Sequence, residues 1–159
     1  MQPRIEEIAE KILVGHALQM SLTNNRTFEL WSGFMSKRKQ IKNQIGADLF
    51  SLQIYDESNL TLFEPTAEFT KWAAVEVSNF ENTNDDFDSL LLPSGLYAVF
   101  VHRGDMSTFH KTMESIFQEW LPNSKYKLDK RPHFELLGEK YKNNHPDSEE
   151  EVWVPVKLN

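Results

Sequence analysis

The stretch from Leu96 to Leu121, LYAVFVHRGDMSTFHKTMESIFQEWL, decides the fold class. Its first six residues are all apolar, and aromatic and β-branched residues dominate them, which is typical of a strand. Apolar residues then recur at helical spacing, which predicts an amphipathic helix from Met106 to Leu121 that stops before Pro122. Its apolar face would consist of Phe109, Met113, Ile116, Phe117 and Trp120. The stretch therefore predicts a strand that leads directly into a helix with an aromatic face.

The first half of the chain shows the same order of elements. Residues 5–22 alternate loosely and contain Gly15, which predicts one long or bulged strand. Apolar residues recur at helical spacing over residues 27–45, and Gly46 follows as a helix stop. Two strands are predicted after each helix: Leu49–Asp56 and Phe69–Val77 in the first half, Arg131–Glu139 and Val152–Leu158 in the second. The polar connections are Glu57–Glu68, Asn79–Ser89 and Lys140–Glu151.

The chain thus reads β-α-β-β twice. This order predicts a single α+β domain, residues 1–159, with a mostly antiparallel sheet. Two pseudo-twofold-related units, about residues 1–80 and 90–159, would account for the repetition. The alternative is that the two halves look alike only because short strands resemble one another.

Composition excludes several classes of protein. The 159 residues carry a formal net charge of −7, which repels phosphate backbones, so no direct binding of nucleic acid is expected. The absence of cysteine excludes disulfides, thiolate nucleophiles and cysteine zinc sites. The opening MQPRIEEIAEK is charged throughout, and no apolar window approaches the roughly 18 residues of a membrane span. We therefore expect a cytoplasmic protein that does not associate with membranes.

Motifs for cofactors and metals are missing. The glycines are scattered, so no phosphate-binding loop is predicted, and the five histidines do not occur at the spacing of a zinc motif. We expect no cofactor and no metal. His102 and His133 fall on strands that could be neighbours, which would allow a metal pair, although ordinary surface histidines are the simpler interpretation.

Glu135 is the most informative polar residue. It lies in the segment HFELL, where His133, Glu135 and Leu137 share one face of a strand and Phe134 lies on the other. If the helices cover the Phe134 face, Glu135 points to the opposite side. A buried glutamate is costly unless it is paired or protonated, so such a residue suits a cation partner or a general base.

Two further strands each present a carboxylate next to a tryptophan. Glu151 and Trp153 share one face of their strand, as do Glu76 and Trp72. Aromatic rings beside a carboxylate add cation–π attraction of about 0.5–2 kcal/mol each for a cation over a ring. The pattern leaves two interpretations open: an exposed sheet face that tolerates glutamate, or an acidic cleft with aromatic walls.

Eight segments in this order and spacing resemble a known family. They are PRIEEIAEKILVG, ELWSGFM, LFSLQIYD, WAAVEV, LPSGLYAVFVHRG, IFQEWLPNSKY, RPHFELLGEKY and EVWVPVK, and they cover nearly the whole chain. Together they resemble a GyrI-like (gyrase-inhibitor-like) effector-binding domain, which also occurs as the ligand-binding part of AraC-type and multidrug-sensing transcription regulators. No single segment is diagnostic.

The resemblance implies two β-α-β-β units with a ligand cleft between them. It places the acidic pocket residue at Glu135, a second pocket glutamate at Glu151, an aromatic pocket position at Trp153 and a recurring tyrosine at Tyr97. From the strand pattern we add Trp72 and Glu76 as ligand-binding candidates. Trp120 is more typical of a core residue. The polar insert Tyr141–Glu150 is long enough that it could cover one end of the cleft.

Three functions follow as hypotheses. The first is a stand-alone module that binds amphipathic, often cationic, organic compounds around a buried Glu135. The second is a hydrolase of reactive cyclopropane-type toxins, in which Glu135 activates water and Tyr97 assists; no catalytic residue is otherwise assigned. The third is a gyrase-inhibitor-like role with an unspecified protein partner, carried by the acidic loop from Asn84 to Asp88.

Overall fold

The sheet is the frame of the molecule. The computed structural model describes residues 1–55, 64–81 and 84–159. Within these residues, nine antiparallel strands form one sheet in the order β1-β6-β9-β8-β3-β4-β2-β5, and β7 pairs with β9 off this path. The strands are β1 Arg4–Ile8, β2 Lys11–Met20, β3 Leu49–Tyr55, β4 Phe69–Glu76, β5 Asp88–Leu92, β6 Gly95–Arg103, β7 Tyr126–Leu128, β8 His133–Leu137 and β9 Glu149–Leu158. The expected α+β class with an antiparallel sheet is confirmed.

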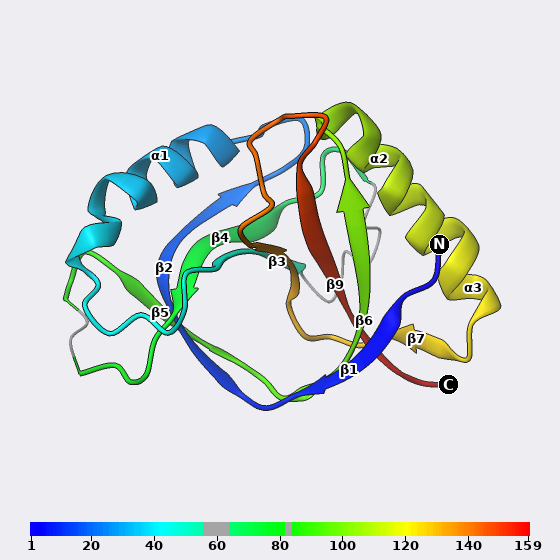
Figure 1. Ribbon diagram of the computed structural model, residues 1–159, viewed down its shortest axis with the longest axis horizontal. Coiled ribbons are helices and arrows are strands. Elements are labelled where there is room, and N and C mark those ends of the chain that lie inside the picture. Colours follow the sequence, from blue (N-terminus) through cyan, green and yellow to red (C-terminus); the bar gives the residue numbers. More distant parts are fainter. Residues whose placement is uncertain (56–63, 82–83) are drawn as a thin grey trace.

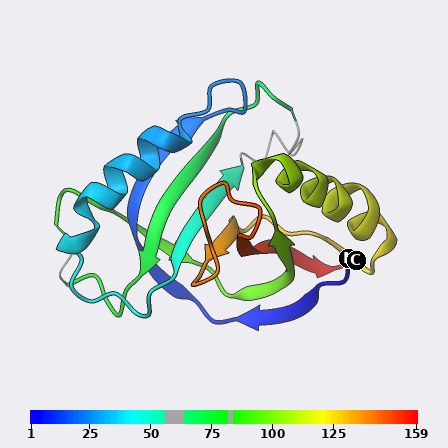
Figure 2. The ribbon, with the colours of Figure 1, turned by 45° about the horizontal axis from the view of Figure 1, so that its top comes forward.

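Two helices lie on the same side of this sheet (Figures 1 and 2). Helix α1, Thr27–Lys37, ends in a 3-10 turn, Arg38–Gln40, and lies over β2 and β4. Helix α2, Met106–Glu114, begins after Asp105, whose carboxylate accepts a hydrogen bond from the backbone N–H of Ser107 at 3.0 Å. It continues through a π-helical stretch, Ser115–Trp120, into α3, Leu121–Asn123. Helix α2 lies over β6.

Each helix covers one end of the sheet with an apolar layer. Leu30 and Phe34 of α1 are buried against strand residues of the first half: Val14, Ala73, Val75 and Val77. Ile116 is buried against strand residues of the second half: Ala98, Phe100, Val152 and Val154. The partly buried Phe109, Met113, Phe117 and Trp120 complete the second layer, as expected from their helical spacing. Trp120 packs on Phe100 and Tyr126, so it is a core residue.

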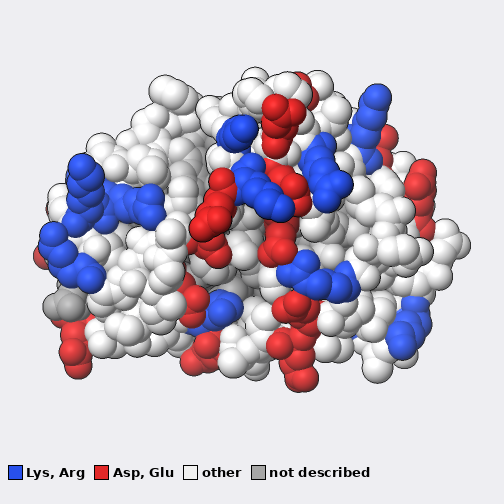
Figure 3. All heavy atoms as spheres, viewed as in Figure 1, with Lys and Arg blue, Asp and Glu red and all other residues white. Residues whose placement is uncertain are grey.

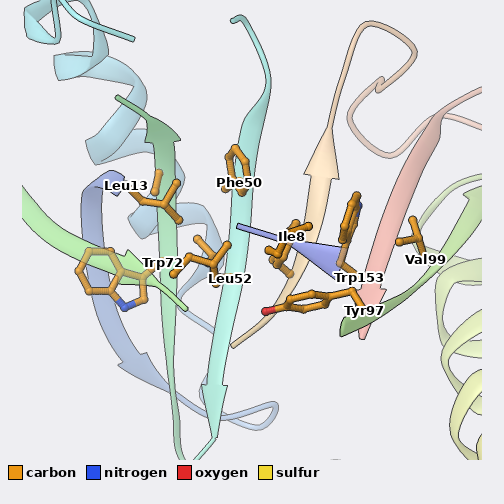
Figure 4. Close-up of a cluster of buried hydrophobic side chains, with 11 residues drawn as sticks. Ile8, Leu13, Phe50, Leu52, Trp72, Tyr97, Val99 and Trp153 are labelled. Atoms are coloured by element: carbon orange, nitrogen blue, oxygen red, sulfur yellow. The ribbon is translucent and has the colours of Figure 1, made fainter. Parts of the chain in front are cut away.

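The other face of the curved sheet encloses a third apolar cluster (Figure 4). Its buried members come from both halves of the chain: Ile8, Leu13, Phe50, Leu52, Trp72, Ala74, Leu92, Tyr97, Val99, Phe134 and Trp153. Strands alternate their side chains between the two faces, so one set of residues meets the helices and the next set meets this cluster.

The two halves meet where β3 pairs with β8, in the middle of the sheet. From the outside to this seam, the order is β5-β2-β4-β3 on one side and β1-β6-β9-β8 on the other. This correspondence is compatible with two pseudo-twofold units, and the repeat stays a prediction. The N-terminal strand β1 crosses the boundary, because it pairs with β6 of the second half.

Several expected boundaries are wrong. The predicted single strand over residues 5–22 is two strands, because β1 pairs with β6 whereas β2 pairs with β4 and β5. The first helix ends near residue 40 and not 45, since Gln44 bridges Val77 and the backbone N–H of Ile45 donates to the Glu76 carbonyl. Gly46 therefore serves a turn with φ +70° and is not a helix stop.

In the second half, the helix does not stop before Pro122. The proline lies in the short segment α3 after the π-helical stretch, at a first-turn position where its missing N–H is tolerated. The last strand begins at Glu149, three residues earlier than expected, so the insert is shorter. Strands β5 and β7 were not predicted as separate elements. Of the expected loop Glu57–Glu68, residues 57–63 lie outside the described residues, as do Asp56 and residues 82–83.

Candidate ligand-binding site

The middle of the helix-covered face is polar. Helices α1 and α2 pack over the outer strands, and the seam between β3 and β8 faces the space between them (Figure 2). The side chains on this face of the seam and its neighbouring strands form a set that we call the central polar cluster: Gln53, Lys71, Glu135 and Glu150, flanked by Tyr55 and His133. The strand register brings them together, because Gln53 lies opposite both Lys71 and His133.

Glu135 is the centre of the cluster. The side-chain amide of Gln53 donates a hydrogen bond to Glu135 Oε1 at 3.4 Å. Burial disfavours the ionised carboxylate and raises the pKa of Glu135 to about 7. The positive charge of Lys71 lowers this pKa, whereas the negative charge of Glu150 raises it. Glu135 can therefore exist in either protonation state near neutral pH.

Glu150 is the second carboxylate of the cluster. It lies on β9 opposite His102 of β6, on the helix-covered face. Burial raises the pKa of Glu150 to about 7, and Lys71 counteracts this. Two carboxylates with raised pKa values on neighbouring strands are costly for folding, which is typical of a functional site.

Lys71 is the cation of the cluster. It lies on β4, and its ammonium group donates a hydrogen bond to the hydroxyl of Thr27, the first residue of α1, at 3.4 Å. Burial lowers the pKa of Lys71, and the charges of Glu135 and Glu150 oppose this effect. Lys71 thus lies at the α1 side of the cluster.

Aromatic rings border the cluster on the α2 side. The rings of Tyr55 and His133 meet edge to face with centroids 5.1 Å apart, and Phe117 of the π-helical stretch lies 6.1 Å from His133. Burial, together with the charge of Arg131, lowers the pKa of His133 to about 3. His133 is therefore neutral at physiological pH and acts here as an aromatic wall.

Three predicted aromatic ligand residues lie on the opposite face of the sheet. Tyr97 is fully buried, and its hydroxyl donates to the carbonyl of Pro132 at 2.8 Å. Trp153 stacks on Phe134 with centroids 5.1 Å apart, and Trp72 lies across the same cluster (Figure 4). These rings fill the core behind the seam, so the structure does not bring them together with Glu135.

The two other predicted glutamates also lie away from Glu135. Glu151 accepts hydrogen bonds from Arg4 at 2.8 Å and from the Trp153 indole at 3.2 Å. Glu76 pairs with Lys11 at 3.6 Å. The condition that placed Glu135 on the side away from the helices is not met, because the helices cover the Glu135 face and Phe134 lies in the opposite cluster. This arrangement separates Glu135 from the five residues that were expected to share its pocket: Glu151, Trp153, Tyr97, Trp72 and Glu76.

Two of the residues that surround Glu135 could have been found in the sequence, because each is a polar residue in an otherwise apolar row of a strand. In FTKWAAVEV, Lys71 shares a face with Phe69, Ala73 and Val75, so a lysine stands in a row that packs beneath a helix. Gln53 stands in the same way in LFSLQIY. Glu150 was assigned to the polar insert and gave no signal, because the start of β9 was misplaced.

Two other predicted features have structural roles. Strands β6 and β8 are not neighbours, because β9 lies between them, so His102 and His133 do not stand side by side. His102 instead shares a hydrogen bond of 2.8 Å with Thr112 of α2. In the acidic loop, Asp86 pairs with Lys37 at 3.6 Å, and Phe87 is buried against His16.

The polar insert connects β8 to β9 at one end of the seam. Its Asn144 accepts a hydrogen bond from the backbone N–H of Met106 at 3.1 Å, which ties the insert to the first turn of α2. In Figure 2 the insert, coloured orange, lies between the two helices. It therefore stands at the Leu137 end of the central polar cluster.

An open hollow of about 340 Å³ lies beside the insert. Its lining includes Glu149, Glu150 and Glu151 with Leu136 and Val101. Glu149 and Glu151 are already paired with Arg103 and Arg4. Figure 3 shows acidic side chains in the middle of this view with Lys and Arg side chains next to them. The hollow adjoins the central polar cluster through Glu150, and within that cluster Glu135 has no arginine partner among the described residues.

The match to a family model, together with the fold, defines the class: this is a GyrI-like effector-binding domain. The sequence matches the model of the Cass2 family, integron-associated effector binding proteins, over residues 4–156. The chain belongs to this family. No curated protein matches the sequence.

Three solved structures illustrate the similarity. SAV2435 bound to tetraphenylphosphonium superposes with a TM-score of 0.71 and 21% identity, covering 99% of this chain and 94% of that chain. The integron cassette protein VCH_CASS2 of Vibrio cholerae gives 0.67 and 17%, covering 98% and 96%. The C-terminal domain of EcmrR gives 0.73 and 14%, covering 99% and 98%. At these identities the structures support the fold. Among the described residues, no helix has the length and apolar character to cross a membrane.

Proposed function

We propose that this protein binds an amphipathic organic cation at the β3–β8 seam, on the sheet face that carries α1 and α2. Glu135 supplies the charge that attracts the cation. The observation that carries the proposal is a partly buried carboxylate with a raised pKa on the part of the sheet that neither helix covers. A protein retains such a costly group where it acts on something.

The surroundings of Glu135 suit an aromatic cation. An ionised carboxylate in a poorly hydrated site gains by pairing with a positive charge, because the ligand replaces the water that burial has removed. The rings of Tyr55, His133 and Phe117 lie on one side of the site and offer faces and edges to an apolar ligand. The tetraphenylphosphonium bound to SAV2435 is a ligand of this chemistry.

The test compares a cation with a neutral molecule of similar shape. Binding of tetraphenylphosphonium and of triphenylphosphine oxide is measured by calorimetry at pH 8.5, for the wild type and for Glu135→Gln. We expect the variant to lose on the order of tenfold or more in affinity for the cation and little for the oxide, since a buried ion pair is lost.

The matched control is Glu76→Gln, which removes the same charge from the opposite face of the sheet. It should leave both affinities unchanged. Equal loss in the two variants would mean that net charge alone attracts the cation, and undiminished binding in Glu135→Gln would overturn the role of Glu135.

Hydrolysis is the second candidate, because a carboxylate with a pKa near 7 can act as a general base at neutral pH. The expected assistance by Tyr97 is not available, since its ring is fully buried behind the sheet. Incubation with a strained cyclopropane electrophile separates the two functions. Product in excess of one equivalent that disappears in Glu135→Gln would establish turnover, whereas binding without product favours the module.

A further inference from the structure

We propose that Lys71 is a specificity-determining residue: its ammonium group acts as a built-in counter-ion that limits the affinity of the seam for organic cations and matches it to ligands with one positive charge. This inference rests on the proposed function. Two ionised carboxylates and one ammonium group leave the central polar cluster with a single net negative charge.

The position of Lys71 is set by the sheet. The residue lies opposite Gln53 across the β3–β4 pair, and Gln53 in turn donates to Glu135. Lys71 therefore stands on the same face as Glu135 with the Gln53 side chain between them. Lys71 is half-buried at this position, beside the first residue of α1.

The direct contact of Lys71 is weak for a buried cation. Its hydrogen bond to Thr27 is 3.4 Å long, and Thr27 begins α1, where the positive end of the helix dipole disfavours a cation. No carboxylate of the described residues lies within 4.0 Å of the ammonium group, in contrast to Lys11 at 3.6 Å from Glu76. The attraction to Glu135 and Glu150 thus acts across a gap.

A gap between a cation and its carboxylates has a consequence for binding. A ligand that enters beside Glu135 breaks no tight ion pair, but it must approach Lys71, which repels it. This repulsion lowers the affinity of the site for the cation. Removal of the charge should therefore raise affinity for a monovalent cation on the order of tenfold, and more for a divalent one.

The test replaces Lys71 by methionine, which keeps the length of the side chain and removes its charge. Lys11→Met is the matched control, because it removes the same charge from an ion pair on the opposite face. The probes are tetraphenylphosphonium, the anion tetraphenylborate of the same shape, and a dication of two triphenylphosphonium groups joined by a short alkyl chain. Measurements at pH 8.5 keep the carboxylates ionised.

We expect Lys71→Met to bind tetraphenylphosphonium on the order of tenfold more tightly, to gain more for the dication, and to bind tetraphenylborate less tightly. Lys11→Met should bind all three as the wild type does. A second readout is the midpoint of the pH dependence, which is the pH at which the affinity for the cation lies halfway between its low-pH and high-pH values. It should move upward in Lys71→Met, because the pKa of Glu135 rises when the nearby positive charge is removed.

The outcomes separate the two proposals. If Glu135→Gln weakens the cation and Lys71→Met changes nothing, the inference on Lys71 is wrong and the proposed function stands. If the wild type binds no cation but Lys71→Met does, Lys71 is confirmed as the barrier and the cation function is overturned. If neither protein binds, both proposals fail. Lys71→Gln replaces the methionine variant if circular dichroism shows that the latter is unfolded.

Discussion

Glu135 lies where a carboxylate is costly, in the middle of a sheet and next to a second carboxylate. Its pKa and that of Glu150 are both raised to about 7. The pKa values of its neighbours His133 and Tyr55 lie far from 7. Burial lowers the pKa of His133 to about 3 and raises that of Tyr55, so both rings stay neutral. The charge of the seam near neutral pH is therefore governed by the two glutamates.

We expect the affinity for tetraphenylphosphonium to rise with pH between about 6 and 8 and to level off above, because the ligand pairs with the ionised carboxylates. The cation itself has a fixed charge, so any change in affinity belongs to the protein. Calorimetry at pH 5.5, 7 and 8.5 measures this, and triphenylphosphine oxide provides the flat reference. A cation affinity that is constant over this range would contradict the prediction.

The same groups make stability depend on pH. Glu135 has a higher pKa in the folded protein than in the unfolded chain, so the folded state binds more protons between about pH 4.5 and 7. Stability from this residue is therefore present below about pH 4.5 and is lost as the pH rises through 7. The lowered pKa of His133 has the opposite effect, with stability gained as the pH rises from about 3 to 6.5.

Glu135→Gln should isolate the first effect. Its free energy of unfolding relative to the wild type is expected to increase by about 3 kcal/mol between pH 4.5 and pH 8, because glutamine pays no ionisation cost. Urea denaturation of both proteins at the two pH values measures this difference, in which the contribution of His133 cancels. A difference that does not change with pH would show that Glu135 is well solvated.

At the level of elements, the contact between β2 and β4 depends on a glycine. A Cβ atom on Gly15 would collide with the carbonyl oxygen of Ala73 and lie 2.7 Å from the Cα atom of Ala74. Both are backbone atoms of the neighbouring strand, so they cannot move aside without separating the pair. Glycine in a strand often marks such a close approach of two backbones.

Gly15→Ala should destabilise the protein by more than about 3 kcal/mol, as expected for a clash with buried backbone. Gly33→Ala in α1 is the control of opposite sign. Its new Cβ would meet only His16 Nδ1 at 3.9 Å, so helix propensity should stabilise it by about 0.5–1 kcal/mol. Thermal unfolding of the two variants gives both values. A Gly15→Ala protein as stable as the wild type would refute the close approach.

The elements themselves could largely be predicted from the sequence. The spacing of Phe109, Met113 and Ile116 was sufficient for α2, because an amphipathic helix carries its packing face in its own residues. The ends of the elements could not be predicted, because tertiary pairing sets them. The bridge from Gln44 to Val77, for example, lies where the first helix was expected to continue. Likewise Glu149 joins β9 only because Arg103 of β6 lies opposite it.

Part of the candidate site could be predicted from the sequence. Glu135 stood out because a carboxylate is rare in an apolar strand. Its partners could not be found, because alternation shows which residues share a face within one strand but not which faces of different strands coincide. That depends on register, and here Phe134 lies opposite Trp153 and Glu135 lies opposite Val152. A single wrong assignment of the covered face therefore moved Trp153, Tyr97 and Trp72 to the wrong side.

For the molecule as a whole, the two faces of the sheet differ in the side chains that they carry. The face away from the helices is filled by aromatic and aliphatic side chains from both halves (Figure 4). The helix face is mainly apolar beneath each helix, and its charged side chains gather on and beside the seam. Changes in the proposed ligand site can therefore occur without disturbing the cluster on the other face.

The crossing of β1 has a consequence for how this chain reaches its folded state. Residues 4–8 are synthesised well before their partner strand β6, which begins at Gly95. Strand β1 therefore stays without this partner until β6 has been synthesised. Contacts between such distant residues slow folding and make it cooperative. Neither half can complete its sheet alone, so the protein should form in one late step and open as a unit.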